Sequence, residues 1–299
     1  MTADMSHYDA LDFGNVGQRA TSAHEQEGAN LSVRDLTRLL HIDYPDDAWL
    51  VRTVFPLRRV HEGEALVHAG DKFHSLYVVR SGCFKTVYTD FSGSEQVLGF
   101  PMCGDLMGAD GIDCGHYSST AISLDTSEVV IVPLTGLARL VVECPSLEAL
   151  LYRVLSRELV RVQNMAWTLG TLGAEGRVAA FLLSLSARLG ALGYSRCSFN
   201  LRMTRQEIGS YLGLKLETVS RALSSLHTAG IIQVHQRSID ITDADALQAV
   251  VDPAAGHAAN GAPPRASASA RNKPGIGQRE RKPRSQPAAG LAWRPLATA

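Results

Sequence analysis

The chain has 299 residues, a formal net charge of −1 and 45% hydrophobic residues, which suits two modest domains with tails. No stretch approaches the roughly 18 apolar residues of a membrane span, and residues 1–30 lack the apolar core of a secretory signal. The cysteines are scattered without a C-x-x-C pair, at Cys83, Cys103, Cys114, Cys144 and Cys197. An odd, dispersed set favours reduced thiols, so we expect a cytoplasmic protein with no membrane partner.

Residues 1–45 are expected to be a mobile N-terminal segment with one short helix. The first 30 residues are polar, rich in Gly and Ala, and without periodicity. The helix is predicted over Leu31–Leu40, with Ser32 as its N-cap.

Residues 46–142 have the sequence pattern of a β domain, with short apolar runs separated by turn residues. Gly82, Gly93 and Gly104 are evenly placed, close to strand-plus-turn spacing. The pattern predicts a small antiparallel barrel or jelly roll. Its expected strands include Ala65–His68, Ser75–Val79, Phe84–Tyr88, Gln96–Phe100 and Val129–Val132.

Short motifs in this region resemble the sensor β-roll of the Crp/Fnr superfamily of transcription regulators. They are Gly63-Glu64, Ala69-Gly70-Asp71, Leu76-Tyr77, Arg80-Ser81-Gly82, Glu95–Phe100 and Gly104-Asp105-Leu106. The resemblance implies a domain like those that bind cyclic nucleotides. It continues in one register from about residue 50 to 245, across the second half of the chain described below.

The sequence argues against cyclic AMP as the ligand of this β-roll. Between Lys85 and Arg139 there is no Lys or Arg, whereas seven acidic residues occur. Cyclic-nucleotide binders of the family place an arginine there, and the comparable residues here are Tyr117–Thr120. A buried phosphate without a cationic partner is expensive, so cyclic AMP is not expected.

The family's oxygen-labile [4Fe–4S] cluster is not expected either. Cluster-binding members place three cysteines before the β-roll and a fourth on a later strand, where this chain has Val130. No cysteine precedes Cys83, and such a cluster normally needs four thiolates. A thiol switch at Cys103 or Cys114, or haem ligation by His116, stays open beside the simpler interpretation of these as structural residues. No cofactor or metal is therefore predicted.

Residues 143–173 are predicted to form a long helix and a hinge. Pro145 suits the first helical turn, and Gly170, Gly173 and Gly176 mark the expected hinge before a helix over Arg177–Leu189. An apolar stripe recurs at spacings of three and four, which suits a homodimer seam. The family's equivalent helix also dimerises. The stripe consists of Leu151, Leu155, Leu159, Val162, Ala166 and Leu169.

Residues 174–250 are predicted to form a winged helix-turn-helix. Thr204 and Glu207 match the S/T-x-x-E capping box, Gly213 follows the last periodic residue of the first helix, and Val219, Leu223 and Leu226 form the buried stripe of the second. The alternation within Gly230–Ile241 indicates the wing. The fold class is thus α+β: antiparallel β-roll, dimerisation helix and winged helix-turn-helix.

The string from Tyr211 to Arg221 resembles the recognition motif of the Fnr branch. We expect Glu217, Ser220 and Arg221 to read bases, with Thr218 on the same face. Arg205 and Lys215 are expected to reach phosphates. The resemblance implies a palindromic operator with half-sites of the TTGAT type, and RNA polymerase as a partner if the protein activates transcription.

Residues 253–299 are predicted to be a disordered tail, with eight basic residues against one acid. It is either a functionless extension or an arm that contacts DNA phosphates. Two alternatives to a DNA-binding regulator are a partner-binding adaptor and a cupin-like enzyme. The enzyme is disfavoured because His61, His68 and His74 form no H-x-H pair. The signal, the target promoters and the direction of regulation stay open.

Overall fold

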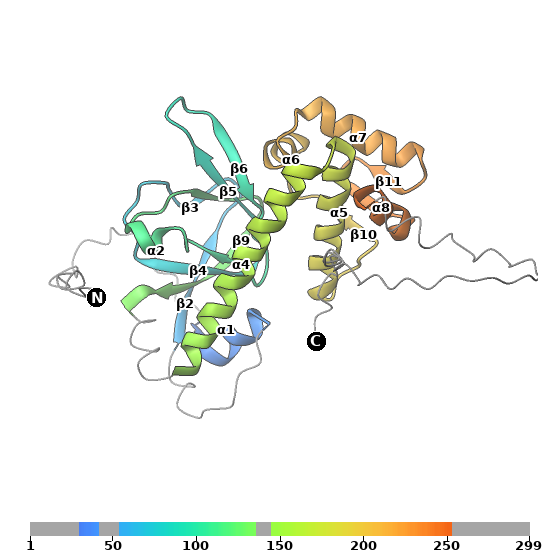
Figure 1. Cartoon of the computed structure of the whole chain (residues 1–299). Helices are drawn as coiled ribbons and strands as arrows, with labels where there is room; N and C mark the ends of the chain where they lie inside the picture. The colour runs from blue at the N-terminus through green and yellow to red at the C-terminus, as the bar shows by residue number, and fades with distance from the viewer. Residues whose placement is uncertain (1–29, 42–53, 136–144, 253–299) are drawn as a thin grey trace, which may run out of the picture. The chain divides into compact units, whose positions relative to one another are not determined.

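The computed structural model describes residues 30–41, 54–135 and 145–252, all within one compact unit of the chain, residues 1–260. Two antiparallel sheets build the first part (Figure 1). The five-stranded sheet has the order β1–β2–β9–β4–β7, and the four-stranded sheet has the order β3–β8–β5–β6. The strands are β1 (Asn30–Ser32), β2 (Val54–Val60), β3 (Ala65–Val67), β4 (Ser75–Ser81), β5 (Phe84–Thr89), β6 (Glu95–Gly99), β7 (Leu106–Met107), β8 (Thr120–Ser123) and β9 (Ser127–Pro133).

The core of this β-roll is centred on β4 and β9. Val78 pairs with Val130 across the two strands, and residues 75–79 of β4 are all buried. A strand covered on both faces carries a continuous apolar run, which is why this segment is easy to recognise in the sequence. The five predicted strands are confirmed as β3, β4, β5, β6 and β9. Strands β1, β2, β7 and β8 were not among the predicted strands, and neither was the one-turn helix α2 (Gly111–Cys114).

The chain from Asn30 to His41 packs onto the β-roll. Helix α1 (Val33–Leu39) confirms the predicted short helix, and Ser32 Oγ caps it by accepting a hydrogen bond from Asp35 N at 3.2 Å. Strand β1 pairs with β2 immediately before the helix. Val33 and Leu36 bury their side chains in the β-roll core. The rest of the predicted mobile segment, residues 1–29 and 42–45, lies outside the described residues.

Two long helices follow the β-roll, α4 (Pro145–Thr171) and α5 (Ala174–Ala191). The predicted helix start at Pro145 is confirmed. The predicted extent of the hinge is wrong, because Gly170 lies inside α4 and Gly176 lies inside α5. A glycine within a helix costs only about 1 kcal/mol, which packing can offset. The link between the helices is Leu172 and Gly173 alone.

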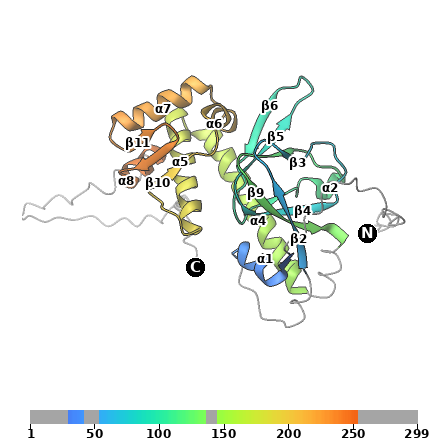
Figure 2. The ribbon, with the colours of Figure 1, turned by 180° about the vertical axis from the view of Figure 1, so that it is seen from behind.

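The last described part combines α5 with three further helices and a small sheet. The sheet has the order β10–β12–β11, and Figure 2 shows β10, β11 and α8 gathered around α5. Its elements are β10 (Ser198–Asn200), α6 (Arg205–Leu212), α7 (Leu216–Thr228), β11 (Ile232–His235), β12 (Ser238–Ile241) and α8 (Ala244–Val251). Among the described helices, none is long and apolar enough to cross a membrane. The predicted basic tail, residues 253–299, lies outside the described residues.

Candidate nucleic-acid interface

Helix α6 begins with the predicted capping box. Thr204 Oγ1 accepts a hydrogen bond from Glu207 N at 3.2 Å, and Glu207 Oε2 accepts one from Thr204 N at 2.7 Å. Both backbone donors are therefore satisfied where the chain enters the helix. Ile208 and Leu212 are buried one turn apart and fix α6 on the core.

The turn between α6 and α7 passes very close to the backbone of α6. Gly213 adopts φ 62°, ψ 38°, the left-handed conformation expected after the last periodic residue of α6. Leu214 N donates to Gly209 O at 2.8 Å. A Cβ placed on Gly209 would lie 2.6 Å from Leu214 O. Only glycine at position 209 allows this approach, so the turn fixes how α7 lies across α6.

Helix α7 buries one face and exposes the predicted reading face. Val219, Leu223 and Leu226 are buried in the core, as the sequence predicted. On the other face Glu217 and Arg221 are exposed one turn apart, and neither takes part in an ion pair among the described residues. Thr218 and Ser220 are half-buried, and Ser220 Oγ accepts a hydrogen bond from Arg205 Nη1 at 3.3 Å.

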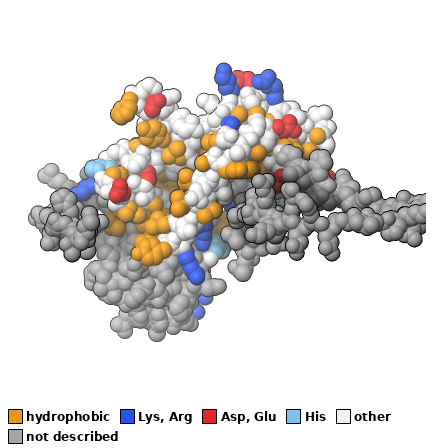
Figure 3. Space-filling view, viewed as in Figure 1, with side chains coloured by type: hydrophobic (Ala, Val, Ile, Leu, Met, Phe, Trp, Pro, Cys, Tyr) orange, Lys and Arg blue, Asp and Glu red, His pale blue; other side chains and the backbone are white. Residues whose placement is uncertain are grey.

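The cations predicted to contact phosphates lie beside this face. Arg205, in the first turn of α6, and Lys215, the N-cap of α7, are both exposed. In Figure 3, Lys, Arg and acidic side chains gather over α6 and α7. The predicted wing is confirmed: β11 and β12 pair from Ile232 with Ile241 to His235 with Ser238. Exposed Arg237 sits at the turn between these strands.

Helix α4 exposes an apolar face in the single chain. Of the predicted stripe, Leu159 is 58% exposed, Val162 65% and Leu169 36%. Ala166 is exposed, Leu155 is half-buried, and Leu151 packs against the β-roll core. Tyr152 and Trp167, which lie outside the predicted stripe, are also exposed. Tyr152 precedes Leu155 by three residues, so an a/d spacing count could have found it. Figure 3 shows apolar side chains along this helix.

The β-roll holds the first helix of the helix-turn-helix through several side chains. Lys85 Nζ donates to Glu207 Oε1 at 2.7 Å, and Val97 N donates to Ser210 Oγ at 2.9 Å. The ring of Tyr211 meets that of Phe100 edge-on, with centroids 5.2 Å apart. Sequence reasoning missed these contacts. They join residues more than 100 positions apart, and no local pattern encodes such pairs.

The side chains left open as a sensor site show no gathered ligand set. Cys103 is half-buried and donates from Sγ to Arg80 O at 3.1 Å, and burial raises the pKa of its thiol. Cys114 is exposed and donates to His116 O at 3.0 Å. In the described ranges no three His, Cys, Asp or Glu side chains group as a metal site.

Similarity to known proteins was found by domain and by whole chain. Residues 176–250 match the family model of the Crp-like helix-turn-helix domain, and residues 57–144 match that of the cyclic nucleotide-binding domain. The transcriptional regulatory protein btr of Bordetella pertussis is 42% identical over 193 residues, which are 64% of this chain and 80% of that protein. The fumarate and nitrate reduction regulatory protein of Escherichia coli K12 is 40% identical over 201 residues, which are 67% and 79% of the two chains.

Solved structures agree with this fold. FixK2 from Bradyrhizobium japonicum is similar with a TM-score of 0.60 at 28% identity, over 66% of this chain and 98% of that one. A CooA variant from Carboxydothermus hydrogenoformans has a TM-score of 0.57 at 18% identity, over 75% and 98%, which speaks for the fold alone. The matched relatives are regulators rather than enzymes, so the cupin-like alternative finds no support.

Proposed function

Because the chain belongs to the Crp/Fnr family of transcription regulators and carries its helix-turn-helix domain, we propose that it works as a homodimer reading a two-fold symmetric operator. The observation that carries the proposal is the pair Glu217 and Arg221, exposed one turn apart near the start of α7 without an ion-pair partner among the described residues. A recognition helix needs such free side chains at its N-terminal half, where it meets base edges in the major groove.

The chemistry of these side chains suggests which bases they read. An arginine donates two hydrogen bonds to O6 and N7 of guanine, and a glutamate accepts one from N4 of cytosine. Arg221 would recognise a guanine, and Glu217 would recognise the cytosine that pairs with this guanine on the opposite strand. Half-sites like the Fnr-type TTGAT contain this G·C pair. Arg205 and Lys215 would contact phosphates and fix the register without reading sequence.

Dimerisation would follow from the apolar face of α4. Leu159 and Val162 project into solvent at 58% and 65% exposure, and a soluble protein seldom leaves such a continuous apolar face uncovered. Two copies of the a/d spacing can pack as a coiled-coil pair. A dimer presents two α7 helices, and two half-sites about one helical turn of DNA apart are what such a pair can read.

The proposal includes DNA binding that needs no cyclic AMP. Ser118 and Ser119, which align with the family's phosphate-binding position, are hydrogen-bonded to a carboxylate. Asp110 Oδ2 accepts hydrogen bonds from Ser118 N at 3.1 Å and from Ser119 Oγ at 2.8 Å. A cyclic phosphate there would face a carboxylate and compete with it for the same donors. The negative charges of the phosphate and of the carboxylate would repel each other.

An iron–sulfur cluster does not fit the described residues either. Val130 stands where cluster-binding members have their fourth cysteine, and it is fully buried in β9 between β2 and β4. An apolar side chain in that position cannot bind iron, and four thiolates are the usual requirement.

If the protein activates transcription, RNA polymerase would be its further partner.

Selection from a random-sequence DNA pool tests the proposal. Purified chain should enrich duplexes with two inverted half-sites containing a G·C pair, and should bind them at least tenfold more tightly, about 1.4 kcal/mol, than shuffled duplexes at one fixed salt concentration. Enrichment of no motif, with a folded protein, would favour the adaptor alternative. Enrichment of a single unpaired half-site would contradict the homodimer.

A further inference from the structure

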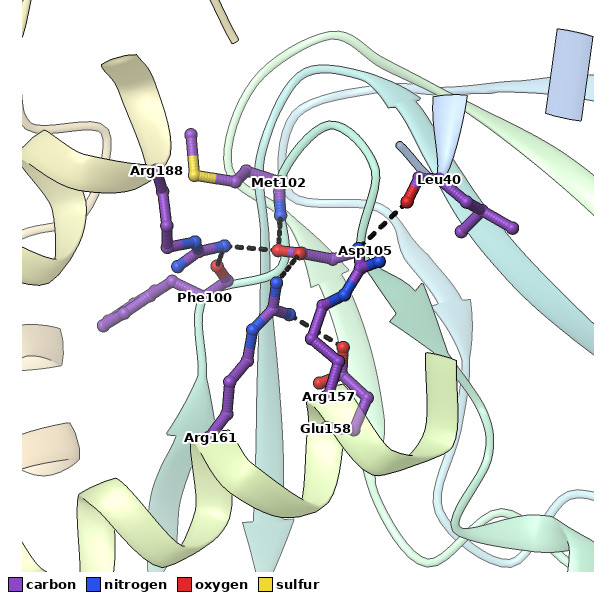
Figure 4. Close-up of polar contacts among 8 residues, drawn as sticks. All are labelled: Leu40, Phe100, Met102, Asp105, Arg157, Glu158, Arg161 and Arg188. Atoms are coloured by element: carbon purple, nitrogen blue, oxygen red, sulfur yellow. Dashed lines mark hydrogen bonds and ion pairs between the residues drawn. The ribbon is translucent and has the colours of Figure 1, made fainter. Parts of the chain in front are cut away.

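One carboxylate, that of Asp105, is buried where three parts of the molecule meet. Its side chain is 5% exposed and lies in the turn before β7. Oδ2 accepts a hydrogen bond from Met102 N at 2.9 Å within the same turn. Figure 4 shows the two guanidinium groups of Arg161 and Arg188 pointing at the same carboxylate from different helices.

The two arginines connect Asp105 to the two long helices. Arg161 of α4 lies 2.5 Å from Oδ1, and Arg188 of α5 binds Oδ2. Arg188 also donates to Phe100 O at 2.9 Å, and Arg161 pairs with Glu158 at 2.8 Å. The cluster therefore balances two carboxylates with two guanidinium groups, and every member has a partner. Arg157, the next arginine along α4, donates to Leu40 O after α1 at 3.0 Å and does not contact Asp105.

Because the carboxylate of Asp105 is buried, its charge needs close partners. A carboxylate withdrawn from water is costly unless it is paired and hydrogen-bonded. Asp105 obtains both its ionic partners from side chains outside the β-roll. If α4 and α5 were placed differently, so that one guanidinium moved away from Asp105, the buried carboxylate would be partly unpaired. The observed placement of the two helices is therefore favoured over slightly different placements.

Helix α5 is held at two separate points. Near its start, Arg177 donates from Nε to Leu172 O at 2.9 Å and from Nη2 to Leu169 O at 2.8 Å, which clamps the short link to α4. In its last turn, Arg188 binds Asp105. These arginines lie eleven positions apart, or about 16 Å along the helix. A helix held at one point can still rotate about that point, whereas contacts near both ends fix the direction of its axis.

The geometry points to Asp105 as a positioning residue, which sets the angle between the dimer helix α4 and the DNA-reading domain that begins with α5. We propose that it thereby determines which spacing of half-sites the dimer accepts. Lys85 also ties the β-roll to the helix-turn-helix, but that ion pair does not involve α4. Asp105 is the carboxylate that joins β-roll, α4 and α5 in one contact set.

Operator spacing provides the first test, and it rests on the proposed function. Asp105→Asn keeps the side-chain shape and removes the charge. We expect wild-type protein to lose about tenfold in affinity or more when one base pair is inserted between the half-sites, and Asp105→Asn to lose less than about threefold. Affinity for a single half-site should stay equal in both proteins. Arg188→Gln should reproduce the effect, and Arg153→Ala, an exposed arginine of α4, should not.

The distance between the two domains provides a second test that needs no DNA. Spin labels on non-canonical residues at exposed positions Glu62 and Ser224, with labelled chains diluted into unlabelled ones, report the distance from β-roll to α7 by pulsed electron resonance. Wild type should give one narrow distribution, and Asp105→Asn or Arg188→Gln a broader or divided one. Equal distributions in folded, dimeric variants would overturn the proposal, whether or not an operator is found. Full spacing discrimination in those variants would overturn it as well.

Discussion

Glu207 divides one carboxylate between the N-terminus of α6 and Lys85 of β5: Oε2 accepts from Thr204 N and Oε1 from Lys85 Nζ, each at 2.7 Å. Burial alone would raise the pKa of Glu207. The hydrogen bonds from Lys85 and Thr204 outweigh burial, and the pKa lies below its ordinary value of 4.5. The cap of the first DNA-binding helix is thus also the point where the β-roll holds it.

This double contact should make part of the stability depend on pH. Because the folded-state pKa is lowered, the stabilisation is complete above the ordinary value of 4.5 and is lost as pH falls through the lower folded value. Glu207→Gln should cost about 1 kcal/mol at pH 7 in urea unfolding. The difference from wild type should shrink toward pH 3. Exposed Glu62→Gln is the control, and a penalty unchanged by pH would contradict the ionic explanation.

Arg221→Ala should weaken operator binding by about 1–3 kcal/mol and relax the preference at one guanine. The reason is the loss of two donors to a single base edge. Competition binding against operators with each base pair replaced in turn measures it, with Arg153→Ala as a charge-matched control. If random DNA loses as much affinity as the operator, Arg221 contacts phosphate and does not read sequence.

Val162→Asp should dissociate the dimer and weaken operator binding. The substitution places a charge against its own copy at the α4 seam, without the partner that a buried charge requires. Sedimentation at micromolar concentration should show monomers. Asn164→Asp adds the same charge to an exposed position of another face of α4 and should leave the dimer intact. A dimeric Val162→Asp protein would place the interface elsewhere.

Gly209→Ala should destabilise the DNA-binding part by about 1–3 kcal/mol, because its Cβ would lie 2.6 Å from Leu214 O and push the turn between α6 and α7 away from α6. Thermal unfolding followed by circular dichroism measures the loss. Gly230→Ala is not a clean control because its φ is positive. Ser224→Ala on the exposed face of α7 is, and it should be close to neutral. Equal melting of Gly209→Ala and wild type would show that the turn relaxes.

The response to signals should be small for two known effectors of the family. Adding cyclic AMP, or purifying without oxygen, is expected to change operator affinity by less than about tenfold, or 1.4 kcal/mol. A cyclic phosphate would meet the carboxylate of Asp110, and Val130 offers no thiolate to a cluster. A cluster-type absorption band, or a large gain with nucleotide, would contradict this. A gain that depends on a thiol reductant would instead indicate Cys103 or Cys114.

The sequence by itself determined the features that local chemistry encodes. The capping box at Thr204, the left-handed Gly213, the buried stripe of α7 and the alternation of the wing all depend on neighbours within a few residues, so each was predictable. The central strands of the β-roll were predictable for the same reason. The continuous apolar run of β4 is a local signal of burial on both faces.

Only the tertiary structure decided which distant residues meet. Asp105 gave no local sign of its partners Arg161 and Arg188, which follow it by 56 and 83 positions along the printed sequence. Lys85 likewise gave no sign of Glu207. Gly170 and Gly176 predicted a wide hinge, but both lie inside helices, and the link is only Leu172 and Gly173. Helix and turn signals act over one or two turns of chain. Ion pairs between elements depend on how the packed core brings those elements together, and no short stretch of sequence records that.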